Sequence, residues 1–542
     1  MTTSDLTRRK LLQMTLGAGQ IALLDKLGFP VFRSSSARAN PNGGTGTDKP
    51  TKLLTIYVPG GWFPVYLWCP LNAAEIASHI PPKTISMKSP VYFTADEVEN
   101  LDGSGNAPGE AGFQRLRSPV QWNEEALAAG LKDPINNGAT SPNGWAWRYY
   151  KLWENATVVH GIDQGTAAHQ SARISAMCGV PGAVYKSPAM HAIVANALSA
   201  VYADTRPLGS VSIGKALVPN PGNLPPVAAP TLLPSLNELE YTLSERIDKA
   251  WAGLRNRTPH AQVDFQGNPL ANPIGTNDMD ERALADMRAL AGTTNSATDA
   301  FYERLYNTYQ GVSKQLAADL VTTIEGTPGA EFNAVPYWIS DNWSYFGTSI
   351  GQGVSSDSGG TWKDDFDLAL KLLKSDLTSA ISLYAPGIKD FYFDTHGAGH
   401  TVHLPYLRSA YDVIGRLLAE MKSTPIGGGK TLLDDTQVLI FSEFSRTWPK
   451  SGTCDHWPTT SVCFAGGNVA PNRMIGGYDL SVGSPTNIGF TGKSISLINE
   501  GGTPLQRPPI SADVVYTVLD LMGLNNVFIP GGPGRIVGVK QA

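Results

Sequence analysis

The chain has 542 residues and a formal net charge of −5, with 47 acidic against 42 basic side chains and no basic stripe, which argues against nucleic acid as a partner. Its 56 glycines and 39 prolines predict long loops on a packed scaffold. The length allows one large α/β domain or two to three ordinary ones.

The N-terminal residues are arranged like a twin-arginine export signal. Arg8 and Arg9 precede an apolar stretch at 11–24, and the small-residue site Ala37-Arg38-Ala39 follows. The apolar stretch is too short to cross a bilayer stably. We therefore expect residues 1–39 to be removed after passage through the twin-arginine translocase, leaving a periplasmic or secreted protein with no stable membrane span. The alternative is a cytoplasmic helix with a chance arginine pair.

The first half of the mature chain predicts strands and then a helical region. Residues 40–50 are rich in small polar residues and predict a flexible leader before a folded domain at 51–542. Buried strands are expected at 53–58, 156–159 and 211–213. Between about 230 and 325 the apolar residues recur at helical spacing, which predicts a helical insertion or cap.

The second half alternates between helices and strands. Helices are predicted at 365–383 and 404–421, and strands at 390–393, 437–441 and 461–465. This alternation is typical of a parallel sheet covered by helices on both faces. The fold class is therefore α/β, a three-layer sandwich with a mostly parallel central sheet. In such sheets the functional site lies at the C-terminal ends of the strands.

Polar side chains follow the predicted strands of the second half. Asp394 and His396 are two residues apart in an extended segment, so both point to the same side. Glu443 follows the next strand, and a later loop carries Asp455 and His456. Carboxylates and imidazoles of this kind suit a divalent ion such as zinc, manganese or magnesium. Such an ion polarises a phosphoryl or sulfuryl oxygen or activates bound water.

Each of these elements also has a purely structural interpretation. The Asp394-Thr395-His396 sequence suits a helix cap followed by an exposed histidine, and 455–456 suits a turn. Arg446 either clamps an anionic substrate or forms an ion pair with Glu443. The functional interpretation is favoured because all three polar clusters follow strands of what should be one sheet edge.

Three motifs resemble the signatures of a known family. Phe393-Asp394-Thr395-His396, residues 442–447 (SEFSRT) and Asp455-His456 resemble the FDTH, SEFGRT and DH signatures of the DUF1501 family. These are exported bacterial proteins related to the alkaline phosphatase and sulfatase superfamily. The resemblance implies an alkaline phosphatase-like core with a metal site above the strand ends.

Residue roles follow from the same resemblance. It implies that Asp394, His396 and His456 bind one ion, while Glu443 and Asp455 assist that ion or bind a second. The superfamily often uses a serine or threonine as nucleophile.

That nucleophile would be Ser171 or Thr166 in this chain. The chain departs from the superfamily pattern at two points. The first strand runs into 58–62 (VPGGW), where an acidic ligand is usual, and Phe444 occupies a position that often carries histidine.

The sequence as a whole predicts an exported metal-dependent hydrolase of phosphate or sulfate esters. Its cofactor would be a divalent metal, with zinc first and manganese, magnesium or calcium as alternatives, and its substrate a small anionic ester or a polysaccharide. The alternative is a non-catalytic periplasmic or surface binding protein that keeps the fold. A third reading places a serine nucleophile at Ser349 in Gly347-Thr348-Ser349-Ile350-Gly351, although no strand or helix is predicted around it. The four cysteines are read as structural disulfides or buried thiols.

Overall fold

The structure is a computed structural model, and the residues that it describes cover the central sheet and helices on its two faces. They are 49–62, 98–104, 109, 113–119, 147, 150–180, 188–202, 206, 208–214, 231–233, 319–330, 332, 360–385, 413–449, 455–482, 487–524, 529 and 532–541. The predicted export signal, the leader up to residue 48, and Ser349, Asp394 and His396 lie outside these ranges. Residues 235–327 form a compact unit of their own, in which 319–325 are helical.

The largest sheet of the described region has eight strands. Their order is β15 (Arg473–Gly476), β4 (Ala156–Asp163), β14 (Thr459–Gly466), β10 (Thr436–Phe441), β1 (Lys52–Tyr57), β7 (Ala380–Tyr384), β5 (Ser210–Ile213) and β6 (Thr231–Leu233). Only β14 runs against the others among these eight. Tyr57 pairs with Phe441 at the last position of β1 and β10, so these two strands end side by side. This shared end positions the candidate site described below.

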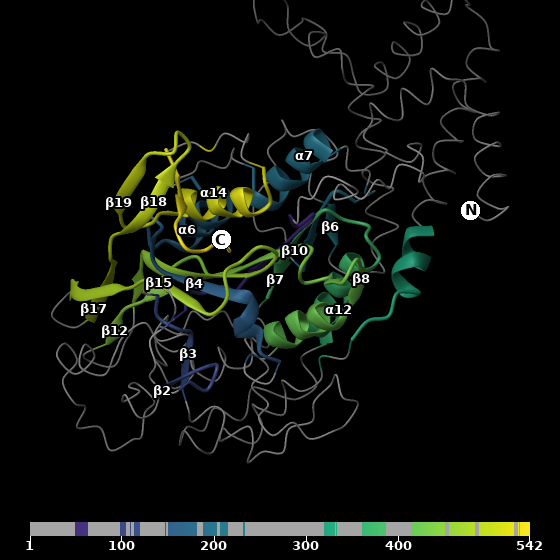
Figure 1. Cartoon of the computed structure of the whole chain (residues 1–542), viewed down its shortest axis with the longest axis horizontal. Coiled ribbons are helices and arrows are strands. Elements are labelled where there is room, and N and C mark those ends of the chain that lie inside the picture. The colour runs from purple at the N-terminus through teal and green to yellow at the C-terminus, as the bar shows by residue number, and fades with distance from the viewer. Residues whose placement is uncertain are drawn as a thin grey trace, which may run out of the picture. The chain divides into compact units, whose positions relative to one another are not determined.

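Helices cover both faces of this sheet (Figure 1). The helices α6 (His169–Cys178), α7 (Met190–Tyr202) and α14 (Ser511–Leu521) lie on one side, and α12 (Gly360–Lys374) lies on the other. Helical residues at 413–423 precede the hairpin that leads into β10.

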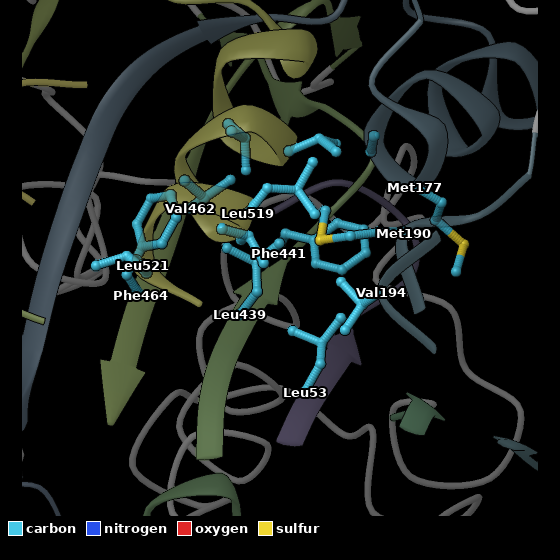
Figure 2. Packing of buried hydrophobic residues seen from close by; sticks show 14 of the residues in the cluster. Leu53, Met177, Met190, Val194, Leu439, Phe441, Val462, Phe464, Leu519 and Leu521 are labelled. Carbon is cyan, nitrogen blue, oxygen red and sulfur yellow. The ribbon is translucent and has the colours of Figure 1, made fainter. Parts of the chain in front are cut away.

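Alternate residues of the central strands build the core on the α6, α7 and α14 face. Figure 2 shows Leu53 of β1 and Leu439 and Phe441 of β10 packed against Met190 and Leu519 of the helices. These side chains are at most 1 % exposed, and burying each one contributes about 1.5–3 kcal/mol. The period of two along the strands therefore fixes their register, and the parallel direction of β1 and β10 places their ends at one edge.

Small sheets, a short helix and loops surround the central sheet in the described residues. They are β11 (Ser445–Arg446) with β13 (His456–Trp457), β12 (Trp448–Pro449) with β17 (Asn487–Gly492) and β16 (Tyr478–Val482), β19 (Pro504–Arg507) with β18 (Ile495–Asn499) and β20 (Gly534–Ile536), β2 (Val98–Asn100) with β3 (Arg117–Pro119), β8 (Pro425–Gly427) with β9 (Lys430–Thr431), and the 3₁₀ helix η6 (Leu152–Asn155).

The structure confirms the predicted α/β class with a mostly parallel sheet. The strands predicted at 53–58, 156–159, 211–213, 437–441 and 461–465 correspond to β1, β4, β5, β10 and β14. The strand predicted at 390–393 lies outside the described residues. The helical insertion predicted at 230–325 stays a prediction over most of its length, because only 319–325 are described as helical.

The helix predicted at 365–383 is wrong in its second half, residues 375–383. The helix α12 ends at Lys374, and Asp376 turns the chain with a φ of 57°. The next buried segment is β7, which pairs with β1 on one side and β5 on the other. Apolar spacing alone did not separate the two, because a short buried run fits a helix and a strand equally well.

Two of the four cysteines are described, and both are buried. Cys178 and Cys463 are buried thiols, and burial raises the pKa of Cys178 to about 12. Of the two alternatives left open by the sequence, the buried thiol is therefore the one that holds for these two residues, while Cys69 and Cys454 lie outside the described ranges. None of the helices in the described ranges is long and apolar enough to span a membrane.

Candidate functional site

The candidate site begins where β10 and β1 end. Glu443 follows β10 by two residues, and its side chain is only 1 % exposed. The loop after β1 holds this carboxylate, because the Gly60 N–H donates to Oε1 at 2.8 Å. The Ser442 hydroxyl donates to Oε2 at 3.0 Å and accepts the Gly61 N–H at 3.1 Å. Two strand ends are thus joined through one carboxylate.

His169 is the side chain that connects Glu443 to the surface. It is the first residue of α6, and its Nδ1 lies 2.9 Å from Oε1 of Glu443. Burial raises the pKa of Glu443, but the hydrogen bonds from His169 and from the Gly60 N–H outweigh this effect, so that the pKa is lowered overall. Glu443 is therefore a charged acceptor at neutral pH.

Three rings form a ring cluster, defined as His169, Phe444 and His456. Their centroids are 4.3 Å apart between His169 and His456, 4.3 Å between Phe444 and His456, and 4.8 Å between His169 and Phe444. The short pairing of β11 with β13 places His456 opposite Arg446 and so brings it to this position. The two imidazoles come from segments that are far apart in the sequence.

Gly61 allows the β1 loop to lie directly against the ring cluster. Its φ is +77°, and a Cβ at this position would stand 2.3 Å from the Phe444 ring. Only glycine accepts both the left-handed backbone and this close approach without strain. The VPGGW sequence therefore has a steric role where the superfamily pattern predicts an acidic ligand.

Arg446 holds the same loop through the Gly60 carbonyl. The side chain is fully buried, its Nε donates to the Gly60 carbonyl at 3.0 Å, and the guanidinium lies 5.8 Å from the Phe444 ring centroid. These contacts hold the Gly60 peptide in place between Arg446 and Glu443. The predicted anion-clamping role of Arg446 stays a prediction.

Of the remaining predicted residues, Asp455 and Ser171 are described. The Asp455 N–H donates to the Thr447 hydroxyl at 2.8 Å and the Asp455 carbonyl accepts the Thr447 N–H at 2.8 Å, which fixes the loop before His456. Ser171 is exposed on α6, two residues after His169. Asp394 and His396 lie outside the described residues, so the structure does not test their predicted convergence.

The structure brings together Glu443 and His456 of the predicted set, and adds His169 between them. Sequence reasoning singled out Ser171 in the His169-Gln170-Ser171 stretch and passed over the histidine. The position of His169 just beyond a buried strand, β4, at the start of the following helix was the signal that could have found it. Within the described ranges no three His, Cys, Asp or Glu side chains gather as a metal-holding group.

Comparison with known proteins supports the family resemblance over one part of the chain. The model of a family described as a protein of unknown function (DUF1501) matches residues 368–489, which include Glu443 and His456. A search of curated proteins finds no match. Among solved structures, the phosphonate monoester hydrolase SpPMH from Silicibacter pomeroyi aligns over 87 % of this chain and 73 % of its own, with 12 % identity and a TM-score of 0.25.

Proposed function

We propose that this chain is an exported, metal-dependent hydrolase of phosphate or sulfate esters with an alkaline phosphatase-like fold. The observation that carries the proposal is the meeting of a buried, charged Glu443 with His169 and His456 at the C-terminal edge of a mostly parallel sheet. Ligand sites of open α/β sheets lie at this edge.

The donor set in the described residues fits a borderline divalent ion in type and is incomplete in number. Two imidazoles are suitable ligands for zinc, with manganese, magnesium and calcium as the alternatives. We propose that Asp394 and His396 supply the remaining ligands, as the family signature implies, with Asp455 nearby. A bound ion would stabilise negative charge on the ester and lower the pKa of the attacking oxygen.

The chain's own groups have separate tasks in this proposal. Glu443 fixes the orientation of His169, while Arg446 and Gly61 hold the loop that carries the Gly60 N–H. Ser171 is proposed as nucleophile because it is exposed in the first turn of α6. Export through the twin-arginine translocase would place the protein in the periplasm or outside the cell.

The proposal is tested by purifying the full chain without chelator and measuring its metal content. A panel of aryl phosphates and aryl sulfates then measures turnover for the wild type, His456→Ala and the control Gln170→Ala, which changes an exposed residue of α6. We expect about one ion per chain. His456→Ala should lose turnover, whereas the control should keep the turnover of the wild type. Turnover that survives complete metal removal would contradict the proposal.

A second function is favoured by the loop after β1. The Gly60 N–H donates to Glu443, and the Gly61 N–H donates to the Ser442 hydroxyl. The loop therefore binds side chains of the protein at the position where the superfamily pattern has an acidic ligand. This arrangement suits a non-catalytic periplasmic or surface protein that keeps the fold and binds an anionic ester or a polysaccharide. Absence of metal together with absence of turnover in the same experiment would favour this second function.

A further inference from the structure

Both carboxylate oxygens of Glu443 already face hydrogen-bond donors of the protein. Oε1 accepts the Gly60 N–H at 2.8 Å and lies 2.9 Å from His169 Nδ1, and Oε2 accepts the Ser442 hydroxyl at 3.0 Å. With 1 % of its side chain exposed, Glu443 lies beneath the surface of the site. A direct metal ligand must offer an oxygen lone pair to the ion, and here the lone pairs face protein donors.

The contact with Glu443 also determines which nitrogen of His169 carries the proton. The Gly60 N–H can only donate, which makes Oε1 an acceptor and Nδ1 of His169 the second donor to it. In the neutral imidazole the other nitrogen, Nε2, then holds the lone pair. The His169 side chain is 40 % exposed, so this ring connects the buried Gly60–Glu443 contact with the surface of the site.

We propose that His169, through Nε2, is the ligand of the bound metal, and that Glu443 is a positioning residue that holds His169 in the Nδ1–H tautomer. A carboxylate behind a metal-bound imidazole orients the ring and makes it more basic. The inference rests on the proposed metal-dependent function. It moves Glu443, predicted from sequence as a direct ligand, one step away from the ion and adds a residue that the sequence motifs did not include.

The first test is zinc titration of the metal-free full-length protein by isothermal calorimetry. His169→Gln removes the ligand nitrogen and Glu443→Gln keeps the shape of the side chain, while Gln170→Ala changes the adjacent exposed residue as a control. We expect Glu443→Gln to bind zinc with the wild-type stoichiometry and about 10–100-fold lower affinity. His169→Gln should lose more than Glu443→Gln, and the control should match the wild type.

Two results would overturn the inference while leaving the proposed function intact. One is wild-type zinc affinity in His169→Gln, and the other is complete loss of zinc in Glu443→Gln with retention in His169→Gln. A wild type that binds no zinc would instead defeat the proposed function and the ligand role of His169 together, and this outcome is recognisable because all four proteins would then behave alike.

Histidine-selective ¹⁵N NMR of the metal-free protein measures the tautomer of His169. This tautomer would not change on substitution of Glu443 if Glu443 had only a structural role. The His169 signals are assigned by their absence from His169→Gln. We expect the Nδ1–H tautomer in the wild type and in Gln170→Ala, and a mixture of tautomers in Glu443→Gln. An Nε2–H tautomer in the wild type would contradict the positioning role of Glu443, even where a variant folds too poorly for calorimetry.

Discussion

The two ends of the central strands both bury charged groups, but they partner them differently. At the N-terminal end, Lys52 forms ion pairs with Asp435 at 2.6 Å and Asp376 at 3.0 Å, and Arg206 pairs with Asp376 at 2.9 Å. This network consists of opposite charges that satisfy one another. At the C-terminal end, the buried Glu443 is held by N–H and hydroxyl groups and by one half-exposed imidazole.

The difference separates a structural network from a candidate functional one. In the N-terminal network each carboxylate already has a cationic partner, including Asp376, whose side chain is 40 % exposed, so these residues are best explained by the fixed geometry of the strand starts. A chain of hydrogen bonds that reaches a half-exposed ring transmits the orientation of the interior to the surface. Buried charge by itself therefore does not mark a site, whereas the direction in which its partners lead does.

Breaking the N-terminal network should have the largest effect on stability. Lys52→Ala leaves the Asp435 carboxylate buried without its ammonium partner, so we expect a loss of about 3–5 kcal/mol in the free energy of unfolding. Urea denaturation followed by circular dichroism measures it. A loss below about 1 kcal/mol would show that this network behaves like a surface ion pair and would remove the contrast between the two ends.

The C-terminal edge also has a second buried carboxyl group, and its burial should make the free energy of unfolding depend on pH. Asp365 of α12 lies beside Gly214, just after β5, and in the described residues it has no ion-pair partner. Burial, followed by the charge of Asp364, raises the pKa of Asp365 to about 7. Below its unfolded pKa of 3.8 this group has no effect on stability, and as pH rises to 7 the folded state loses stability because the unfolded state ionises first.

Asp365→Asn should therefore stabilise the protein above pH 7 and change little near pH 4. The expected gain is at most roughly 4 kcal/mol, since each pKa unit corresponds to about 1.4 kcal/mol. Urea denaturation at pH 4.5, 6 and 8 measures the trend, with the exposed Asp479→Asn as control. An equal effect of Asp365→Asn at all three pH values would contradict the assignment.

The close approach of the β1 loop to the ring cluster predicts a somewhat smaller effect. Gly61→Ala adds a methyl group against Phe444 in a left-handed backbone, so we expect destabilisation of about 2–4 kcal/mol and displaced ring contacts. Gly428→Ala is the matched control, because its φ is +62° and no atom lies within 4 Å of the added Cβ. Thermal unfolding of both variants separates backbone strain from the Phe444 contact, and equal losses would show that this contact is unimportant.

The smallest effect is expected at an ion pair whose lysine is exposed. Lys540 lies 3.4 Å from Asp520, and its side chain is 36 % exposed, so Lys540→Ala should cost no more than about 1 kcal/mol. Urea denaturation at low and high salt measures this cost, which should fall further as salt rises. A loss comparable to that of Lys52→Ala would mean that burial does not govern the strength of these pairs.

The central strands could be predicted because their apolar runs are short, buried and followed by turn residues. Lys52–Tyr57 and Thr436–Phe441 are examples, and both were located to within a residue. The strand Ala380–Tyr384 was not separated from the preceding helix, because its identity is decided by pairing with β1 and β5 and not by local spacing.

The candidate site was predicted in part, since motif residues reveal chemistry and not contacts. Glu443 and His456 were found because they follow strands of the same edge. His169 was missed, because its contact with Glu443 joins residues 274 positions apart. The burial of Glu443 and the attachment of Arg446 to Gly60 also depend on how the β1 loop folds back, which no local pattern encodes.

The two buried thiols make the interior of this protein accessible to measurement. Cys178 belongs to α6 and Cys463 to β14, so one reports on a covering helix and the other on the sheet. A thiol-reactive reagent can modify either one only while the surrounding layer opens. Pulse labelling followed by peptide mass spectrometry would therefore time the opening of the helix layer and of the sheet separately, without any introduced probe.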